Sequence, residues 1–155
     1  LGIASDEQLR AEHAALLARV AARAPGVRIH GVLVERMATG LVELIVGGRN
    51  DPAFGPVVVA GLGGVLAEAL GDVATRLAPV DTEEARAMLG ELRGAAILGP
   101  FRSRPAVDVA AAAEVIARVS QLLVELPGIQ ELDLNPVLVG AGGEGCVAVD
   151  ALAVV

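Results

Sequence analysis

The chain has 155 residues, a formal net charge of −7, and basic residues that are all arginine. We expect this length to bury one core, and the apolar runs, broken by 19 glycines and 8 prolines, are too short for the roughly 20-residue span of a bilayer. The sequence has no basic cluster, no tryptophan and no tyrosine, which argues against nucleic acid as a partner. Because lysine is absent, a P-loop and a Schiff-base site are excluded within this chain.

An amphipathic helix is predicted over residues 6–24. Ser5 and Gln8 have the spacing of a capping box, and apolar residues recur at helical spacing up to Pro25. The opening LGIASDEQLR lacks a basic segment followed by an apolar run, so we expect no secretory signal and a cytoplasmic location. The lone cysteine, Cys146, excludes an intramolecular disulfide.

Two strand-like runs follow, HGVLVERM at residues 30–37 and LVELIVGG at residues 41–48. The short link between them favours a hairpin, in which Glu35 would face Glu43. Facing carboxylates repel unless a cation or a strong donor lies between them, and a shift of register would instead leave both in solvent. If they do face each other, the pair offers an acid and a base for an independent small enzyme.

A turn and the apolar strand PVVVA lead into a cluster of glycines, Gly61, Gly63 and Gly64. Glycines at such positions allow a backbone to pass very close to another group. A dinucleotide-binding fingerprint would need a further glycine where Leu66 stands, followed by a continuous helix, which Gly71 interrupts. The cluster therefore predicts a close backbone approach and not a Rossmann fold.

Capping residues signal two further helices. Asp81 with Glu84 begins one apolar-periodic stretch, and Asp108 begins the other. Between these helices, Arg102 and Arg104 either hold an anion or belong to a solvated loop. Because helices and strands mix irregularly and the strands have hairpin-length links, we predict an α+β fold. It would be a mainly antiparallel sheet with helices packed on one face.

The chain ends in a predicted β-hairpin with one apolar and one polar face. Alternation puts Leu132, Leu134 and Leu138 on the first face and Glu131, Asp133 and Asn135 on the second. With a turn over residues 140–145, Val139 pairs with Cys146, and the antiparallel count brings Asn135 opposite Asp150. Side chains paired in this way are roughly 5 Å apart at Cβ, and such a cluster of hard oxygens suits Mg²⁺. The alternative is a sheet edge whose polar face is solvated.

Three segments carry a likeness to a known family: VLVERM with VELIVGG, DPAFGPVVVAGLGGVLAE followed by DVATRLAP, and ELDLNPVLV ending in VAVD. Together they resemble the ATP-grasp region of the NDP-forming acyl-CoA synthetases, which are akin to the β subunit of succinyl-CoA synthetase. The likeness covers residues 30–155, and the opening LGIASDEQL is similar to the point where the family's first ATP-grasp subdomain gives way to the second. The resemblance implies that residues 1–155 are one domain, the second half of an ATP-grasp module, with residues 1–26 leading in from the absent first half.

The resemblance also implies a site for ATP or ADP. Glu35, Arg36 and Met37 take the place of the hinge strand beside the adenine. Four residues take the phosphate side, namely Gly61, Gly63, Gly64 and Glu68. Arg76 is a further candidate on that side.

For the metal, the resemblance assigns Asn135 and Asp150 as Mg²⁺ ligands. The corresponding spacing in succinyl-CoA synthetase is one residue shorter, and the difference falls in the glycine-rich turn. Asp133 stands where the relatives have an acidic residue that contacts a swinging phosphohistidine, so Asp133 is the catalytic candidate.

Two parts of the family's machinery are absent from this chain. The phosphate-contacting lysine belongs to the first subdomain and the phosphorylated histidine to a CoA-ligase domain, and these two parts are the partners that the resemblance implies. In the family, the complete enzyme interconverts acid, CoA and ATP with acyl-CoA, ADP and phosphate, so we expect the chain alone to bind nucleotide without turnover. A regulatory or interaction module that keeps the fold without chemistry is the alternative, and a homodimer is a further partner left open.

Overall fold

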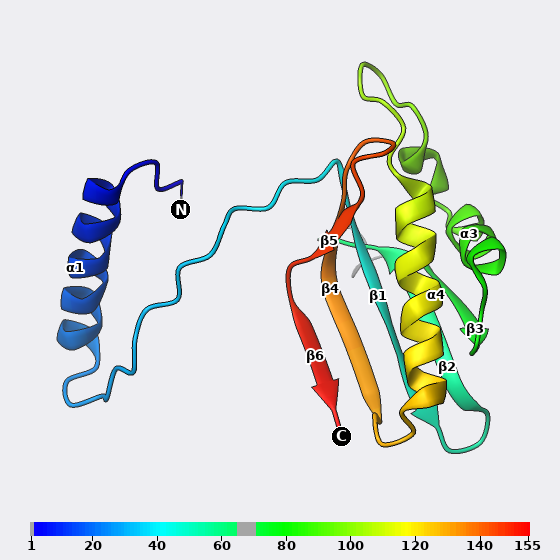
Figure 1. Cartoon of the computed structure of the whole chain (residues 1–155), viewed down its shortest axis with the longest axis horizontal. Coiled ribbons are helices and arrows are strands. Elements are labelled where there is room, and N and C mark those ends of the chain that lie inside the picture. The colour runs from blue at the N-terminus through cyan, green and yellow to red at the C-terminus, as the bar shows by residue number, and fades with distance from the viewer. Residues whose placement is uncertain (1, 65–70) are drawn as a thin grey trace. The chain divides into compact units, whose positions relative to one another are not determined.

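The computed structural model describes residues 2–64 and 71–155 (Figure 1). The chain divides into two compact units, Leu1–Met37 and Ala38–Val155. The prediction of a single domain stays a prediction. Within the described ranges, no helix has both the length and the apolar character needed to span a membrane.

The first unit holds helix α1 (Asp6–Arg23), close to the bounds predicted for it. It begins at Ser5, whose hydroxyl accepts a hydrogen bond from the Gln8 N–H at 3.1 Å. The Gln8 side chain in turn accepts the Ala4 N–H at 2.9 Å. This is the predicted capping box, with its return bond moved to the residue before the cap. No residue of α1 is buried.

The second unit is built on one antiparallel sheet. Its strands in the described residues are β1 (Val42–Asp51), β2 (Gly55–Leu62), β3 (Val73–Leu77), β4 (Glu131–Val139), β5 (Cys146–Ala148) and β6 (Ala151–Val154). The order across the sheet is β3-β2-β1-β4-β5, and β6 also pairs with β4. Every one of these pairings is antiparallel, which confirms the predicted sheet type.

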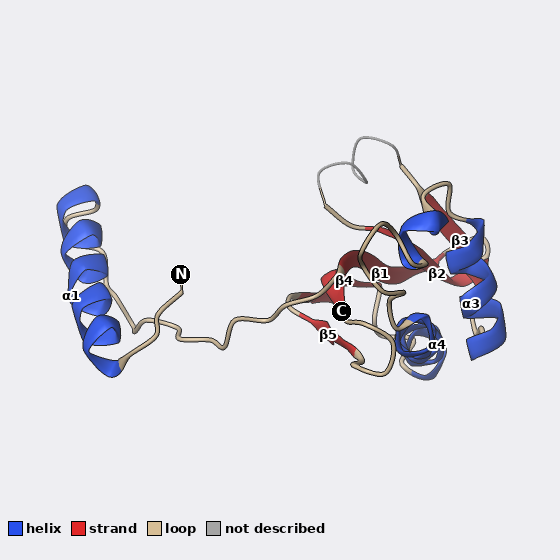
Figure 2. Ribbon diagram, turned by 90° about the horizontal axis from the view of Figure 1, so that it is seen from above, coloured by secondary structure: helices blue, strands red, loops and turns tan. Residues whose placement is uncertain are grey.

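Helices α3 (Thr82–Glu91) and α4 (Val109–Glu125) lie on one side of the sheet, with the short 3-10 helix η1 (Ala95–Leu98) beside α3 (Figure 2). The carboxylate of Asp81 caps α3 and that of Asp108 caps α4, as predicted. Each accepts a backbone N–H of the first turn that has no partner within its helix.

Buried apolar side chains fill the space between these helices and the sheet. Leu44 and Val58 from the sheet and Ile116 from α4 are fully buried in one cluster. Residues that alternate with the core positions along each strand point to the other side of the sheet, which α3 and α4 do not cover (Figure 2). The sheet therefore has a core face and an open face.

The predicted hairpin between residues 30–37 and residues 41–48 is wrong. Residues 27–40 form neither helix nor strand. β1 is paired with β2 along one edge and with β4 along the other, so it has no edge left for residues 30–37. The facing pair of Glu35 and Glu43 therefore does not form.

β4 changes the direction of its side chains halfway along, at a β-bulge against β1. Between Leu134 and Val137, β4 carries one residue more than the stretch of β1 that faces it. Val137 is therefore buried on the core face, while Leu138 lies opposite Glu43 on the open face. The prediction that Leu138 shares a face with Leu132 is wrong for this reason.

Candidate functional site

The predicted register of the terminal hairpin is confirmed. Val139 pairs with Cys146, and β6 continues the same antiparallel count along β4. At the junction of β5 and β6, the Asn135 N–H donates to the Asp150 carbonyl oxygen at 3.3 Å. Asn135 therefore lies opposite Asp150, and both residues are exposed.

Asp133 lies on the open face, two residues before Asn135 along β4. It is flanked by Gly47 of β1 on one side and by Leu152 of β6 on the other. Partial burial raises the pKa of the Asp133 carboxyl, and the charges of Glu131 and Asp150 raise it further. A cation beside Asp133 would favour its charged form.

Gly47 lets β1 and β4 approach each other closely beside Asp133. A Cβ at position 47 would lie 3.5 Å from Asp133 Oδ1 and 2.6 Å from the Leu132 carbonyl oxygen. The sequence analysis did not identify Gly47 as a neighbour of the site. The signal that could have found it is the pair of consecutive glycines, Gly47 and Gly48, inside a strand, where glycine marks a close approach of another group.

The donors around Asn135 fit Mg²⁺ with two protein ligands. Asn135 offers an amide oxygen, and Asp150 offers a carboxylate whose Oδ1 also accepts the Ala151 N–H at 2.8 Å. Mg²⁺ is usually held by one or two protein oxygens and keeps waters and substrate phosphates as its other ligands. In residues 2–64 and 71–155, no three His, Cys, Asp or Glu side chains gather to hold an ion by themselves. The exposure of Asp150 also suits the alternative of a solvated sheet edge, since its charge carries no burial cost.

The glycine cluster at the end of β2 lies against neighbouring strands of the same sheet. The Gly63 N–H donates to the Glu43 carbonyl oxygen at 2.7 Å, and a Cβ at position 63 would lie 3.1 Å from that oxygen. A Cβ at Gly61 would come within 2.8 Å of the Val73 side chain. Gly64 has a φ of +81°, a conformation that favours glycine. The predicted close approach is thus observed with β1 and β3, and contact with phosphate stays a prediction.

Four other predicted nucleotide contacts also stay predictions. Glu35, Arg36 and Met37 are exposed and belong to the first unit. Glu68 lies outside the residues that the structure describes. Among the candidate site residues, the sheet brings together Asp133, Asn135 and Asp150 of the terminal hairpin.

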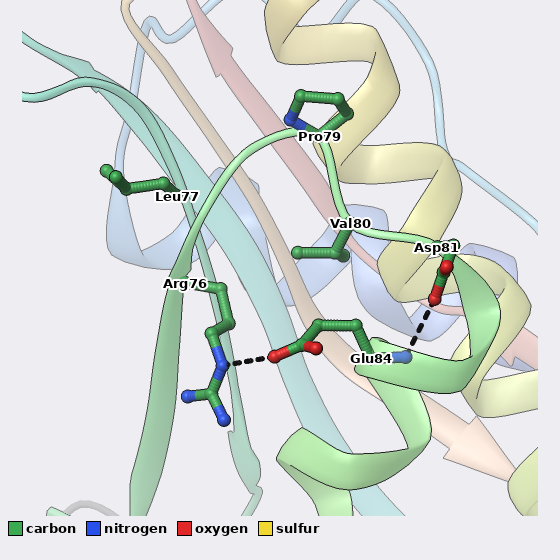
Figure 3. Close-up of a pocket in the computed structure, with 6 residues that line it drawn as sticks. All are labelled: Arg76, Leu77, Pro79, Val80, Asp81 and Glu84. Atoms are coloured by element: carbon green, nitrogen blue, oxygen red, sulfur yellow. Dashed lines mark hydrogen bonds and ion pairs between the residues drawn. The ribbon is translucent and has the colours of Figure 1, made fainter.

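Arg76 lies on the core face of the sheet, away from Asp133. It pairs with the core residue Val58. Its guanidinium donates to the Glu84 carboxylate at 2.6 Å (Figure 3), and it also donates to the Glu91 carboxylate. These hydrogen bonds, that to Glu91 first, raise the pKa of Arg76. A groove of about 480 Å³ opens beside this cluster, lined by Arg76, Leu77, Pro79, Val80, Asp81 and Glu84. The geometry gives Arg76 the role of tying β3 to α3.

The two arginines between η1 and α4 behave differently from each other. Arg104 donates to the carbonyl oxygens of Leu41, at 2.7 Å, and Ile97, so it joins this loop to the start of β1. Arg102 is exposed, and its guanidinium lies over the Phe101 ring, 5.4 Å from the ring centroid. For Arg104 the alternative of an anion site is therefore set aside.

Asp108 fixes the turn between β4 and β5. Besides capping α4, its carboxylate accepts the N–H groups of Gly143, at 2.9 Å, and Gly145, at 3.0 Å. Backbone donors, the Ala111 N–H first, lower the pKa of the Asp108 carboxyl. Apart from the helix cap, the sequence carries no signal of this link, which holds the turn that separates Asn135 from Asp150.

A solved acetyl-coenzyme A synthetase shares this fold. Dinucleotide forming acetyl-coenzyme A synthetase 1 of Ca. Korarchaeum cryptofilum, solved with coenzyme A, Ca-AMPCP and HgCl+, matches with a TM-score of 0.86 at 35% identity. The match covers 100% of this chain and 67% of that chain. The model of the ATP-grasp domain family matches residues 1–155. The chain therefore belongs to the ATP-grasp domain family.

Comparison with curated relatives shows which kinds of enzyme the chain is similar to. The chain is 42% identical, over its whole length, to a trans-feruloyl-CoA synthase from an unknown prokaryote. It is 37% identical, over 97% of its length, to subunit beta of acetate–CoA ligase [ADP-forming] I of Pyrococcus furiosus. The chain spans 22% of the first relative and 64% of the second. Its homologues are ADP-forming acetate–CoA ligases and acyl-CoA synthetases, which confirms the resemblance found in the sequence.

Proposed function

We propose that this chain supplies the magnesium and nucleotide side of an ATP-grasp domain in an NDP-forming acyl-CoA synthetase. The observation that carries the proposal is the register that sets Asn135 opposite Asp150, with Asp133 two residues before Asn135 on β4. The Korarchaeum relative was solved with Ca-AMPCP, which supports a metal and nucleotide site in this fold.

Asn135 and Asp150 are the proposed Mg²⁺ ligands. The Ala151 N–H occupies Oδ1 of Asp150, which leaves Oδ2 and the amide oxygen of Asn135 for the ion. When bound, Mg²⁺ offsets the negative charge of the phosphates during phosphoryl transfer. Two protein oxygens suit an ion that keeps water and phosphate as its other ligands.

Asp133 is the proposed catalytic residue. In this role its carboxylate accepts the imidazole N–H of a phosphohistidine carried by the CoA-ligase domain, and it thereby fixes which ring nitrogen reacts. A hydrogen bond donated to the carboxylate favours its charged form and so lowers the pKa that burial and neighbouring charges raise.

The nucleotide itself is proposed to be ATP or ADP. The hinge residues Glu35, Arg36 and Met37 border the adenine in this proposal. The phosphates lie beside Gly61, Gly63, Gly64 and Glu68. Glycine in such a loop allows phosphate oxygens to approach the backbone closely.

The whole enzyme requires more than this chain. In the proposal, the first ATP-grasp subdomain supplies the lysine that contacts phosphate, and the CoA-ligase domain supplies the histidine that carries the phosphoryl group. The complete enzyme, which we place in the cytoplasm, converts an acid, CoA and ATP to acyl-CoA, ADP and phosphate. The chain alone binds nucleotide with Mg²⁺ and does not turn over.

Titration calorimetry with MgATP and MgADP, up to millimolar concentration, tests this proposal. Asp150→Asn and Asn135→Ala, or omission of magnesium, are expected to weaken binding at least about tenfold, since a charged ligand contact contributes roughly 1.5–3 kcal/mol. Glu114→Gln is the matched control because it removes one carboxylate charge from the exposed surface of α4. This control is expected to bind like the unaltered chain.

Binding that is indifferent to magnesium and to Asp150 would contradict the ligand assignment. Absence of metal-dependent binding, together with a partner affinity that Asn135→Ala leaves unchanged, would instead support the regulatory or interaction module.

A further inference from the structure

The position of Asp150 opposite Asn135 depends on the turn at residues 140–145. Asp150 follows β5, and β5 is joined to β4 through this turn. Four of the six turn residues are glycine, the residue with the most backbone freedom to lose on folding. The register of a hairpin is fixed by the geometry of its turn, so a turn that can change shape does not fix it. A slip of one residue would move Asp150 away from Asn135.

β5 itself adds little to hold the register. It pairs with β4 at three residue positions. Of its side chains, Cys146 is packed against the core, whereas Val147 and Ala148 are exposed. Little apolar surface is therefore buried by the strand that leads to Asp150. The register consequently depends on contacts that the turn makes with other parts of the chain.

The Asp108 carboxylate makes these contacts. Its Oδ2 accepts the Gly143 N–H at 2.9 Å and the Gly145 N–H at 3.0 Å, and both glycines have a positive φ. Its Oδ1 accepts the Ala111 N–H of the first turn of α4 at 3.0 Å. The Asp108 N–H in turn donates to the Gly140 carbonyl oxygen at 2.9 Å. One residue thus binds both ends of the turn and the start of α4.

The helix that Asp108 caps is fixed in the core. α4 buries Ala112 and Ile116 in the cluster between helices and sheet. Just before the cap, the Ala106 carbonyl oxygen accepts the Gly142 N–H at 3.1 Å. Asp108 therefore transfers the position of a buried helix to an exposed, glycine-rich turn.

The contacts of Asp108 require a carboxylate. Its two oxygens accept three N–H groups from the turn and the helix. A side-chain amide of the same shape has one acceptor oxygen, and its nitrogen is a donor. An amide at this position could therefore keep the bond to α4 or the bonds to the turn, but not both.

We infer that Asp108 is a positioning residue of the proposed metal site, because its carboxylate fixes the register of the terminal hairpin and thereby holds Asp150 opposite Asn135. This inference rests on the proposed function, in which Asn135 and Asp150 are the ligands of Mg²⁺. It goes further by giving a role in metal binding to a residue that is not itself a ligand.

Amide hydrogen exchange in the full chain tests the register. The probe is the Asn135 N–H, which donates to the Asp150 carbonyl oxygen. Asp108→Asn is expected to accelerate exchange at Asn135 at least about tenfold more than at the amides of β1 and β2, because the hairpin then opens locally. Glu144→Gln is the matched control, since it makes the same exchange of carboxylate for amide on an exposed residue of the turn, and it should leave Asn135 unchanged. No acceleration at Asn135, or an equal one in β1 and β2, would overturn the inference.

Titration calorimetry, with MgATP and with ATP alone, tests the effect on the metal. Asp108→Asn is expected to weaken the magnesium-dependent binding at least about fivefold, since only molecules in the correct register bind, and Glu144→Gln to leave it unchanged. A role confined to stability would not move the affinity of the folded protein. Unchanged affinity in Asp108→Asn, with MgATP bound by the unaltered chain, would overturn the inference and leave the proposed function intact. No binding by the unaltered chain would refute the proposed function and the inference with it.

Asp108→Ser replaces Asp108→Asn if that variant does not fold. Serine caps a helix about as well as aspartate does, so the bond to the Ala111 N–H is kept. With one side-chain oxygen, serine loses the two bonds to the turn. The changes expected at Asn135 and in the affinity are the same as for Asp108→Asn, and unchanged values would overturn the inference.

Discussion

The terminal hairpin and the 27–37 segment are both rich in β-branched and apolar residues, yet they differ in state. In the hairpin, β4 pairs with β1 on one side and with β5 and β6 on the other. The 27–37 segment forms no strand and exposes its apolar side chains. β-propensity alone therefore does not make a strand, since a free edge and a core to cover are needed as well.

Truncating one leucine in the sheet and one in the 27–37 segment should give the largest difference in the free energy of unfolding. Leu44 of β1 is fully buried and Leu33 is 80% exposed. Leu44→Ala is expected to lower the free energy of unfolding by about 2–5 kcal/mol, because it leaves a cavity, and Leu33→Ala to change it by about 0.5 kcal/mol or less. Denaturant unfolding of both variants measures this. A large loss from Leu33→Ala would show that the segment is packed in the chain alone.

Alanine substitutions at two glycines also compare the sheet with the 27–37 segment. A Cβ at Gly47 would lie 2.6 Å from the Leu132 carbonyl oxygen, while a Cβ at Gly31 meets nothing within 4 Å. Gly47→Ala should therefore force β1 and β4 apart and destabilise the fold by roughly 1–3 kcal/mol. Gly31→Ala should be neutral or slightly stabilising, because it restricts the unfolded chain. Thermal unfolding compares the two variants, and equal melting temperatures would refute the assigned β1–β4 spacing.

Acid should loosen the hairpin through Asp108. Hydrogen bonds from backbone N–H groups lower its pKa below the ordinary value of 3.8 in the folded state. Its stabilising effect is therefore fully present above that ordinary value and is lost as the pH falls through the lower folded pKa. Asp108→Asn should flatten the acid side of the stability profile, whereas Glu125→Gln, exposed on the same helix, should leave it unchanged. Unfolding measured across the acid range checks both, and a profile that Asp108→Asn leaves unaltered would refute this role.

The smallest effect on stability is expected at Asp133, whose pKa is shifted in the opposite direction to that of Asp108. Its folded pKa is raised, so its favourable contribution is present below the unfolded pKa and is lost as the pH rises through the folded pKa. Asp133→Asn should therefore slightly increase the free energy of unfolding near neutral pH and change little at about pH 3. Denaturant titrations at the two pH values measure this. A decrease at neutral pH would mean that a cation already balances the carboxylate.

The sequence was a good guide where pairing is local. The turn at residues 140–145 sets Val139 against Cys146, so the position of Asn135 opposite Asp150 followed by counting. The helix caps at Asp81 and Asp108 could also be predicted from the sequence, because each side chain bonds the first turn of its own helix.

Competition between distant parts of the chain for the edges of a strand cannot be predicted from a single sequence. The sequence predicts that residues 30–37 pair with β1, because the two segments are neighbours in the chain. In the structure, β2 and β4 occupy both edges of β1. The bulge that turns Leu138 to the open face depends on the pairing of β4 with β1, and Gly47 matters only because that pairing sets it beside Asp133. Such features require the sheet order, which a single sequence does not display.

The central claim is that Asn135 and Asp150 of the terminal hairpin hold the metal of a metal–nucleotide complex. Its most direct test is the line broadening of backbone amide signals when Mn²⁺ replaces Mg²⁺ in a complex with ATP. The account predicts that broadening is strongest at residues 131–135 and 148–151 and disappears from them in Asp150→Asn. Broadening centred on the acidic helix α3, around Glu83 and Glu84, and unchanged in Asp150→Asn, would contradict it.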